Sequence, residues 1–306
     1  MIQNKISRQL LIINLLLENP EGLSKSQIVI FVEKKINLSN ENFNYLDLAF
    51  KRDLKDIRND FGIEVLFSRK SNIYTLSSFS IDDTRLELLL NSFKIFSSLL
   101  NSSGLPEYII PEKRKASGLV HFSIITEAIN QNKFLEFDYF KYDTNEINHK
   151  KIKPLALKES KNRWYLIGSY ENQSDIRAFG LDRITDLYEV DQKFKSKISI
   201  SEINNYYNDS FAMFTDEKVE FVKLSFDLRD GNYIKSFPIH HSQKCELNSE
   251  NNKYFITLNV RITLDFIMEL LSRSWSLEVI EPLHLKEKIA SIFQEALERN
   301  KLQEKI

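Results

Sequence analysis

The chain has 306 residues, of which 42% are hydrophobic, so it is too long for one ordinary core and suits two or three domains. Its 42 Lys and Arg nearly balance 43 Asp and Glu, for a net charge of −1. This balance does not exclude nucleic-acid binding, which needs only a local excess of positive charge. The single Cys245 excludes an internal disulfide and fits a reducing compartment. The apolar run at residues 10–17 is too short to span a membrane, so we expect a cytoplasmic protein.

Two amphipathic helices are predicted at the start of the chain. Apolar residues recur at helical spacing in KISRQLLIINLLLEN, and Pro20 then stops the helix. Ser24 and Gln27 have the spacing of a capping box, in which each side chain bonds the other's backbone N–H. This pattern predicts that a second helix, KSQIVIFVEKKI, begins directly after the serine.

A third predicted helix carries cations on one face. Lys51, Lys55 and Arg58 fall at i, i+4 and i+7, so they share a face, and the opposite stripe is apolar. Two alternating runs then flank a turn with Arg69 and Lys70 at its tip, which predicts a β-hairpin. Three helices followed by a hairpin is the order of a winged helix-turn-helix. In that fold the third helix can lie in the major groove of DNA, where cations contact phosphates and polar side chains contact base edges.

The cationic face has an alternative interpretation as a solvated surface, with Asp53 and Asp56 balancing its charges. The order of the elements favours DNA binding over this alternative. The predicted DNA contacts are Asn44, Tyr45, Lys51, Arg52, Lys55, Arg58, Arg69 and Lys70.

The middle of the chain predicts a helix at residues 81–101, a loop with two prolines, and another helix at residues 117–133. Short strands follow: FLEFDYF, KIKPLALK, RWYLIGSY, IRAFGLDRI and DLYEVDQKF. Several short strands at close spacing predict a small β-barrel. Residues 141–163 hold seven Lys or Arg against three acidic residues, which is a local excess of positive charge.

The strand RWYLIGSY has two faces. Trp164 and Leu166 point one way and Tyr165 the other. Aromatic residues in strands usually pack in a core, so a core hairpin remains an alternative to a ligand surface. Arg177 lies between apolar strand residues and needs an anionic partner or contact with water. Arg183 can pair with the carboxylate beside it. Together with the basic stretch, these arginines support an anionic ligand as a hypothesis.

The last third predicts a small α+β domain. Residues 195–216 have the composition of a linker. A strand, a hairpin, the helix LDFIMELLSRS, the strand LEVIEP and a closing helix follow in order.

Five stretches of the chain resemble bacterial WYL-domain transcriptional regulators. NRWYLIGSY followed by RAFGLDRI resembles the signature of that domain, and AINQNKFLEFDY and KIKPLAL resemble its earlier strands. AFKRDLKDIRNDFGIEV resembles the third helix and wing that precede the domain, and LEVIEPLHLKEKI resembles its C-terminal extension. The implied fold is an α+β multidomain protein: a winged helix-turn-helix (1–78), a helical linker (79–116), an SH3-like β-barrel as the WYL sensor (117–194), a linker (195–216) and a C-terminal α+β extension domain (217–306).

The resemblance implies a DNA-binding regulator, usually a homodimer, that binds double-stranded operator DNA. Its WYL domain is implied to sense a nucleic-acid-derived or other anionic ligand, such as single-stranded DNA, and some members control phage-defence or DNA-damage genes. The ligand-binding residues carried over are Tyr139, Lys153, Tyr165, Arg177 and Arg183. The chain departs from the family at DLAFK, where the charge of Asp47 repels phosphate. We therefore place base contacts near Asn44 and Tyr45.

An enzyme is not predicted. None of the five histidines has metal-ligand spacing to a cysteine or carboxylate, and no cofactor is expected. Cys245 near His240 offers a thiol nucleophile, but no third group completes a catalytic set. The alternative to a regulator is a module that binds single-stranded nucleic acid directly and whose N-terminal helices contact a protein. A preference for duplex or for single strands separates the two functions.

Overall fold

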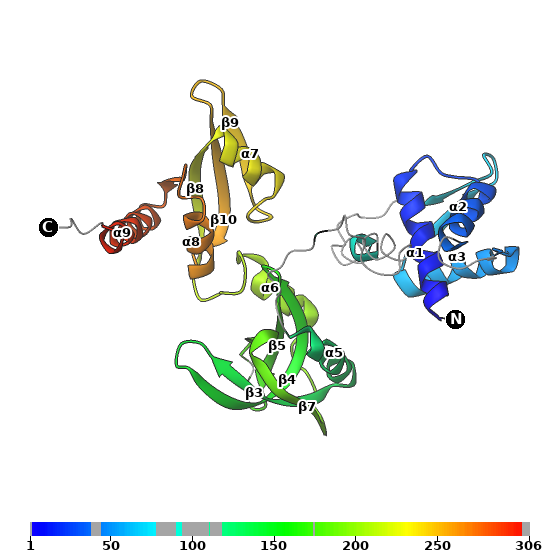
Figure 1. The fold of residues 1–306 in the computed structure, drawn as a ribbon, viewed down its shortest axis with the longest axis horizontal. Helices are drawn as coiled ribbons and strands as arrows, with labels where there is room; N and C mark the ends of the chain where they lie inside the picture. Colours follow the sequence, from blue (N-terminus) through cyan, green and yellow to red (C-terminus); the bar gives the residue numbers. More distant parts are fainter. Residues whose placement is uncertain are drawn as a thin grey trace. The chain divides into compact units, whose positions relative to one another are not determined.

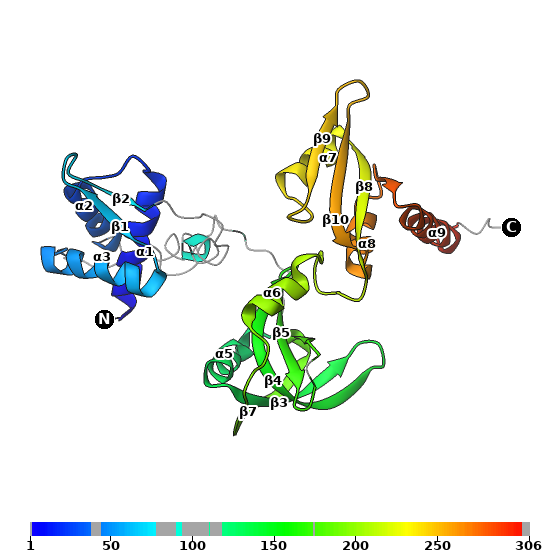
Figure 2. The same cartoon turned by 180° about the vertical axis from the view of Figure 1, so that it is seen from behind.

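The computed structural model describes residues 2–37, 44–77, 90–93, 110, 118–173 and 175–301. The chain divides into two compact units, residues 1–112 and 113–306 (Figures 1 and 2). Most of the helix predicted at residues 81–101, and nearly all of the loop after it, lie outside the described residues. Residues 90–93 are helical, and Leu90 and Phe93 pack into the core of the first unit. No described helix is long and apolar enough to cross a membrane.

The first unit contains three helices followed by a β-hairpin, as predicted. Its elements are α1 (Ile2–Glu18), α2 (Lys25–Asn37), α3 (Asp47–Phe61), β1 (Val65–Ser68) and β2 (Ile73–Leu76). The capping box before α2 is confirmed, because the Ser24 N–H donates to Oε1 of Gln27 at 2.8 Å and the Gln27 N–H donates to Oγ of Ser24 at 3.4 Å. Gly62 ends α3 in the left-handed conformation that glycine favours, with φ of 68°.

The hairpin is tied to the helices through the segment between α1 and α2. The Leu23 N–H donates to the Tyr74 carbonyl at 3.0 Å, and the Tyr74 N–H donates back at 2.7 Å. Phe50 and Ile57 of α3 are fully buried against α1 and α2. The apolar stripe expected on α3 therefore faces the core and turns the opposite face of the helix to solvent.

The second unit begins with a five-stranded antiparallel sheet in the order β6-β5-β4-β3-β7. Its strands are β3 (Lys133–Lys141), β4 (Glu146–Ser160), β5 (Arg163–Tyr170), β6 (Arg177–Gly180) and β7 (Ile184–Lys193). The sequence predicted a closed SH3-like barrel, whereas this sheet is open. β6 has only four residues, pairs with β5 alone and leads through η2 (Leu181–Arg183) to β7 at the opposite edge. The two edge strands do not pair within the described residues.

Helices cover both faces of this sheet (Figure 1). α5 (Phe122–Gln131), preceded by η1 (Leu119–His121), packs on the face that includes Trp164 and Leu166, and the rings of Trp164 and Phe122 lie 5.0 Å apart. α6 (Ile200–Asn208) packs on the other face, against Tyr165 and Ile167. The predicted alternation of RWYLIGSY is therefore confirmed. α6 lies within the segment predicted as a linker.

The C-terminal part is an α+β arrangement around a four-stranded sheet of order β11-β8-β10-β9. Its elements are β8 (Val219–Asp227), α7 (Leu228–Ser236), β9 (Lys244–Asn248), β10 (Lys253–Arg261), α8 (Leu264–Leu271), β11 (Glu278–Glu281) and α9 (Leu283–Arg299). α7 is the one of these helices that was not predicted. It approaches the sheet so closely that a Cβ at Gly231 would lie 2.2 Å from the Tyr254 ring, so glycine is required there.

Candidate nucleic-acid and ligand-binding surfaces

The exposed face of α3 is a candidate DNA-binding surface. Lys51, Arg52, Lys55 and Arg58 are all exposed there, opposite the buried stripe. Lys51 pairs with Asp47 at 2.9 Å and Arg58 with Glu64 at 3.1 Å. Neither Arg52 nor Lys55 pairs with a carboxylate among the residues that the structure describes, so both are available to an anionic partner.

Asp53 and Asp56, which would balance the charge of this face if it were a solvated surface, pair with other residues. Asp53 is buried and pairs with Arg8 of α1, whose Nε lies 2.6 Å from its Oδ2. Asp56 pairs with Lys5, also of α1, at 2.8 Å. Both acids therefore tie α3 to α1 and do not balance the cations on the opposite face. This arrangement weakens the interpretation of that face as a neutral solvated surface.

Tyr45 does not suit the role predicted for it. Its side chain is 4% exposed, packs edge-to-face on Phe50 and donates its hydroxyl proton to Asp53. A buried hydroxyl with a carboxylate acceptor is held in the core and cannot reach a base edge. Asn44, one residue earlier, is exposed, as are Arg69 and Lys70 at the tip of the hairpin.

Two residues of the α3 face were missed in the sequence. Leu48 is 76% exposed and lies seven residues before Lys55, on the same face. Asn59 lies four residues after Lys55 and is also exposed. A helical wheel centred away from Phe50 would have found both. An exposed leucine can contact a thymine methyl group, and an asparagine can bond an adenine edge.

Tyr139 and Arg183, two of the predicted ligand-binding residues, lie together. The Tyr139 ring is buried, and its hydroxyl accepts the Gly180 N–H at 3.2 Å. Burial raises the pKa of the Tyr139 hydroxyl. The Arg183 guanidinium lies over the rings of Tyr139 and Tyr142, at 4.9 and 5.0 Å from their centroids. Arg183 thus stacks on two tyrosines, while the neighbouring Asp182 pairs with Arg163.

The other three predicted ligand-binding residues lie elsewhere in the sheet. Tyr165 is half-buried beneath α6, and burial raises the pKa of its hydroxyl. Arg177, at the start of β6, is exposed and lies 3.6 Å from Asp175. Lys153 of β4 is half-buried and lies opposite Ser169 of β5. Tyr165 lies close enough to the stacked pair of Tyr139 and Arg183 to interact with it electrostatically, whereas no described contact joins Arg177 or Lys153 to that pair.

The groups considered for thiol chemistry bond to other partners. The ring nitrogens of His240 lie 2.7 Å from Oγ of Ser242 and 2.8 Å from the Asn208 carbonyl. The Cys245 sulfur accepts from Gln243 at 3.2 Å. In the described part of the chain, no group of three or more His, Cys, Asp or Glu residues could hold a metal ion.

His149 on β4 forms a pH-sensitive contact with β3. Its Nδ1 lies 2.9 Å from Oδ1 of Asp138 and its Nε2 lies 3.5 Å from Oε2 of Glu136. These carboxylates raise the pKa of His149 above its ordinary value of 6.5. The contact therefore stabilises the fold fully below pH 6.5, and this stabilisation is lost as pH rises through the raised pKa.

We expect His149→Gln to flatten the pH dependence of the melting temperature across that window. The ring resonances of His149 should titrate in NMR with a midpoint above 6.5, whereas a midpoint at or below this value would contradict the assignment.

Two family models match the second unit of the chain. Residues 120–189 match the WYL domain, and residues 218–297 match the WCX domain. The protein is therefore a WYL-domain protein. The WCX match follows the WYL match in the chain.

The chain is also similar to three other known proteins. One solved structure is Proteasome accessory factor B/C (PafBC) of Arthrobacter aurescens, with 19% identity and a TM-score of 0.39, covering 99% of this chain and 48% of that one. Another is a CRISPR Cas-related protein, with 8% identity and a TM-score of 0.39, covering 88% and 76%. A curated relative, the DNA-directed RNA polymerase subunit beta of Eimeria tenella, is 20% identical over 283 residues, which are 88% of this chain and 26% of that protein. The chain thus spans about a quarter of that relative and about half of the PafBC chain.

Proposed function

We propose that this protein is a DNA-binding transcriptional regulator in which the first unit acts as a winged helix-turn-helix and the WYL domain senses an anionic, nucleic-acid-derived ligand. The observation that carries the proposal is the face of α3. Arg52 and Lys55 are exposed there and pair with no carboxylate in the described part of the chain, while Asp53 and Asp56 are bound to α1. The WYL and WCX domains that follow support a regulator over a protein-contact module.

The geometry of the first unit suits a duplex. A helix with one face buried and cations on the other can enter the major groove, where Lys and Arg contact phosphates and other side chains contact bases. Leu48 and Asn59 add an apolar and an amide group to that face. Arg69 and Lys70, at the hairpin tip, supply a second contact with the phosphate backbone.

We extend the proposal to a cytoplasmic homodimer that binds a pseudo-palindromic operator. Two copies of α3 would then read two half-sites separated by one or more helical turns. The mass of the protein in solution and a footprint on DNA from upstream of its own gene test this part. A monomeric mass with a single-half-site footprint would contradict it. By resemblance to the family, we propose phage-defence or DNA-damage genes as the targets, which expression profiling after DNA damage tests.

Substitution of Arg177 separates sensing from DNA binding. We expect Arg177→Ala to leave duplex affinity unchanged, because this exposed arginine belongs to the second unit, but to abolish the change in affinity caused by short single-stranded oligonucleotides. The measurement is fluorescence anisotropy of labelled operator with and without oligonucleotide. Arg299→Ala, an exposed arginine at the end of α9, is the control and should respond as the wild type does. A normal response in Arg177→Ala means that the ligand site lies elsewhere. Coupling must also be reciprocal, so operator DNA must alter ligand affinity by the same factor.

A further inference from the structure

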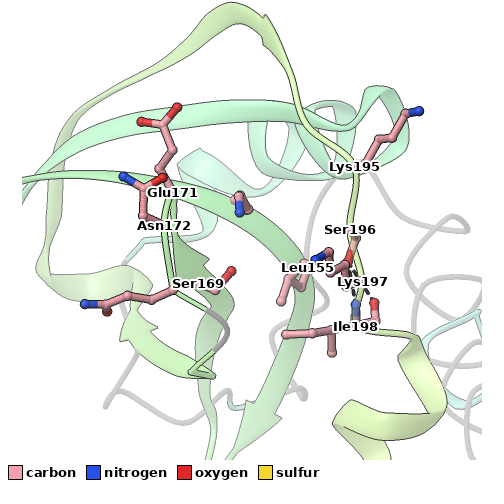
Figure 3. Close-up of a pocket in the computed structure, with 10 residues that line it drawn as sticks. Leu155, Ser169, Glu171, Asn172, Lys195, Ser196, Lys197 and Ile198 are labelled. Carbon is pink, nitrogen blue, oxygen red and sulfur yellow. Dashed lines mark hydrogen bonds between the residues drawn. The ribbon is translucent and has the colours of Figure 1, made fainter.

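A polar pocket of about 200 Å³ lies beside the β4–β5 pair, where the segment after β7 passes over the sheet (Figure 3). The polar side chains that line it include Lys153, Ser169, Asn172, Lys195, Ser196 and Lys197. We propose that this pocket binds the phosphate group of a small phosphorylated ligand. The inference rests on the proposed function and names the site and the chemical group that the sensor recognises.

The pocket is built by the sheet itself. Lys153 and Ser169 are directly opposite each other in the β4–β5 register, so their side chains lie side by side. The strands approach closely here, because a Cβ at Gly168 would lie 2.7 Å from the Lys153 carbonyl oxygen. The register then shifts between Pro154 and Ala156, just past this point. The positions of the lysine and the serine are therefore set by backbone pairing.

The opposite wall is a short segment with its own internal bonds. Oγ of Ser196 donates to the Ile198 carbonyl at 2.8 Å and accepts the Ile198 N–H at 3.1 Å (Figure 3). Ile198 packs with the apolar cluster beneath α6. This anchoring holds Lys197 at the pocket, whereas the ammonium group of Lys195, which also lines it, points away from the other lining residues (Figure 3).

The lining carries a net positive charge, with three lysines against one carboxylate. No carboxylate among the described residues pairs with Lys153, Lys195 or Lys197. The one acidic lining residue, Glu171, accepts from Nε2 of Gln192 at 3.1 Å and lies 3.9 Å from Nζ of Lys151. Its charge is therefore directed to residues outside the lining.

Ser169 is a second, independent sign of a ligand. The residue is only 3% exposed and lines the pocket, yet its hydroxyl has no hydrogen-bond partner in the described part of the chain. The Ser169 oxygen is not one of the fully buried polar atoms that lack a partner, so it opens into the pocket and is free to bond there. An oxygen of a bound anion would accept this proton.

The lining identifies the class of ligand. Ammonium groups, the Ser169 hydroxyl and an amide can all donate to a tetrahedral oxyanion, and ionic hydrogen bonds of this type are the strong ones. Among the described residues no aromatic side chain lines the pocket, so these residues offer no surface on which a base can stack. At about 200 Å³ it is smaller than sites that enclose whole drug-sized ligands, which fits recognition of the charged group alone.

Calorimetric titration of the full chain at low salt tests the proposal. The probes are inorganic phosphate, a nucleoside 5′-monophosphate beside its nucleoside, and one oligonucleotide with either a 5′-phosphate or a 5′-hydroxyl. We expect at least one phosphate-bearing probe to bind and its phosphate-free partner to bind about tenfold more weakly, as the loss of ionic hydrogen bonds requires. The probe that binds identifies the source of the phosphate. Absence of binding by every phosphate probe overturns the proposal.

Ser169→Ala is the sharpest variant. The hydroxyl makes no bond within the described protein, so its removal should leave the melting temperature unchanged or slightly higher while phosphate affinity falls several-fold. Lys153→Gln should lower affinity about tenfold. Lys193→Gln is the matched control, because it removes the same charge from an exposed position on β7 outside the pocket. Equal losses of phosphate affinity in Lys153→Gln and Lys193→Gln would show that the effect is one of overall charge, and would contradict the assignment of the site.

Operator binding is measured on the same variants. Loss of phosphate binding with normal duplex affinity supports the pocket. If the protein binds operator and its response to oligonucleotides requires Arg177, but no phosphate probe binds, then only the proposal of the pocket is wrong. If the pocket binds phosphate but the protein does not bind operator, the proposed function is wrong and the proposal of the pocket stands.

Discussion

Asp53→Ala is expected to destabilise the first unit by about 3–5 kcal/mol, the usual cost of removing one partner from a buried ion pair. Asp53 is 1% exposed and accepts two hydrogen bonds from the guanidinium of Arg8, at 2.6 and 3.0 Å, and a third from Tyr45. Alanine leaves a largely buried cation and a buried hydroxyl without this acceptor. Because the pair joins α1 to α3, the loss should loosen the contact that orients α3.

Hydrogen exchange of the amides in α1 and α3, measured on the full chain, gives the local free energy of unfolding. Glu21→Ala removes an exposed carboxylate that has no described partner from the same unit, and should cost less than about 1 kcal/mol. Arg8→Met/Asp53→Leu in a Tyr45→Phe background removes both charges and the hydroxyl together, and should recover most of the lost stability. If the single and combined variants are equally unstable, packing and not the ion pair holds the helices.

The second large effect is expected in DNA binding. Arg52→Ala/Lys55→Ala should lower duplex affinity and reduce the slope of log affinity against log salt by about 2, since each phosphate contact releases about 0.9 counterion. Lys51→Ala and Arg58→Ala should each have a smaller effect, because these side chains already pair with Asp47 and Glu64.

The measurement is duplex affinity across a salt series. Lys286→Ala/Lys288→Ala removes two exposed lysines from α9 and should leave the slope unchanged. An unchanged slope in the α3 double variant would show that this face does not contact DNA. A wild-type protein that prefers single strands of any sequence would favour the rival function, in which the first unit contacts a protein.

Local patterns in the sequence predicted most of the elements correctly. The capping box at Ser24 and the hairpin after α3 depend on residues a few positions apart, and both are present. The two faces of the strand at Trp164 follow from alternation alone. The segment at residues 195–216 was interpreted as a linker because its polar composition hid the spacing of the apolar residues of α6, which pack only once the sheet exists.

The candidate surfaces were predicted less completely. The cations of α3 could be assigned to one face by helical periodicity, but the burial of Tyr45 could not, since its acceptor Asp53 is held in place by Arg8 from a helix 45 residues away in sequence. Pairing with the neighbouring Asp182 was the alternative to a ligand-binding role for Arg183, yet Asp182 pairs with Arg163 and the arginine stacks on two tyrosines. Which cation pairs with a given carboxylate depends on the distances between them in the folded chain.

The sequence by itself determined most of the order of the helices and strands, the buried stripe of α3 and the resemblance to WYL-domain regulators, because these depend on periodicity and on contiguous motifs. Only the tertiary structure decided which cations of α3 pair with described carboxylates, that the described strands of the five-stranded sheet stay open and that a pocket forms between Lys153 and the segment at residues 195–198. The reason is that charge pairing, edge pairing and pocket formation all join residues far apart in the chain. Their energies depend on which groups the fold brings within a few ångströms, and no local spacing encodes that distance.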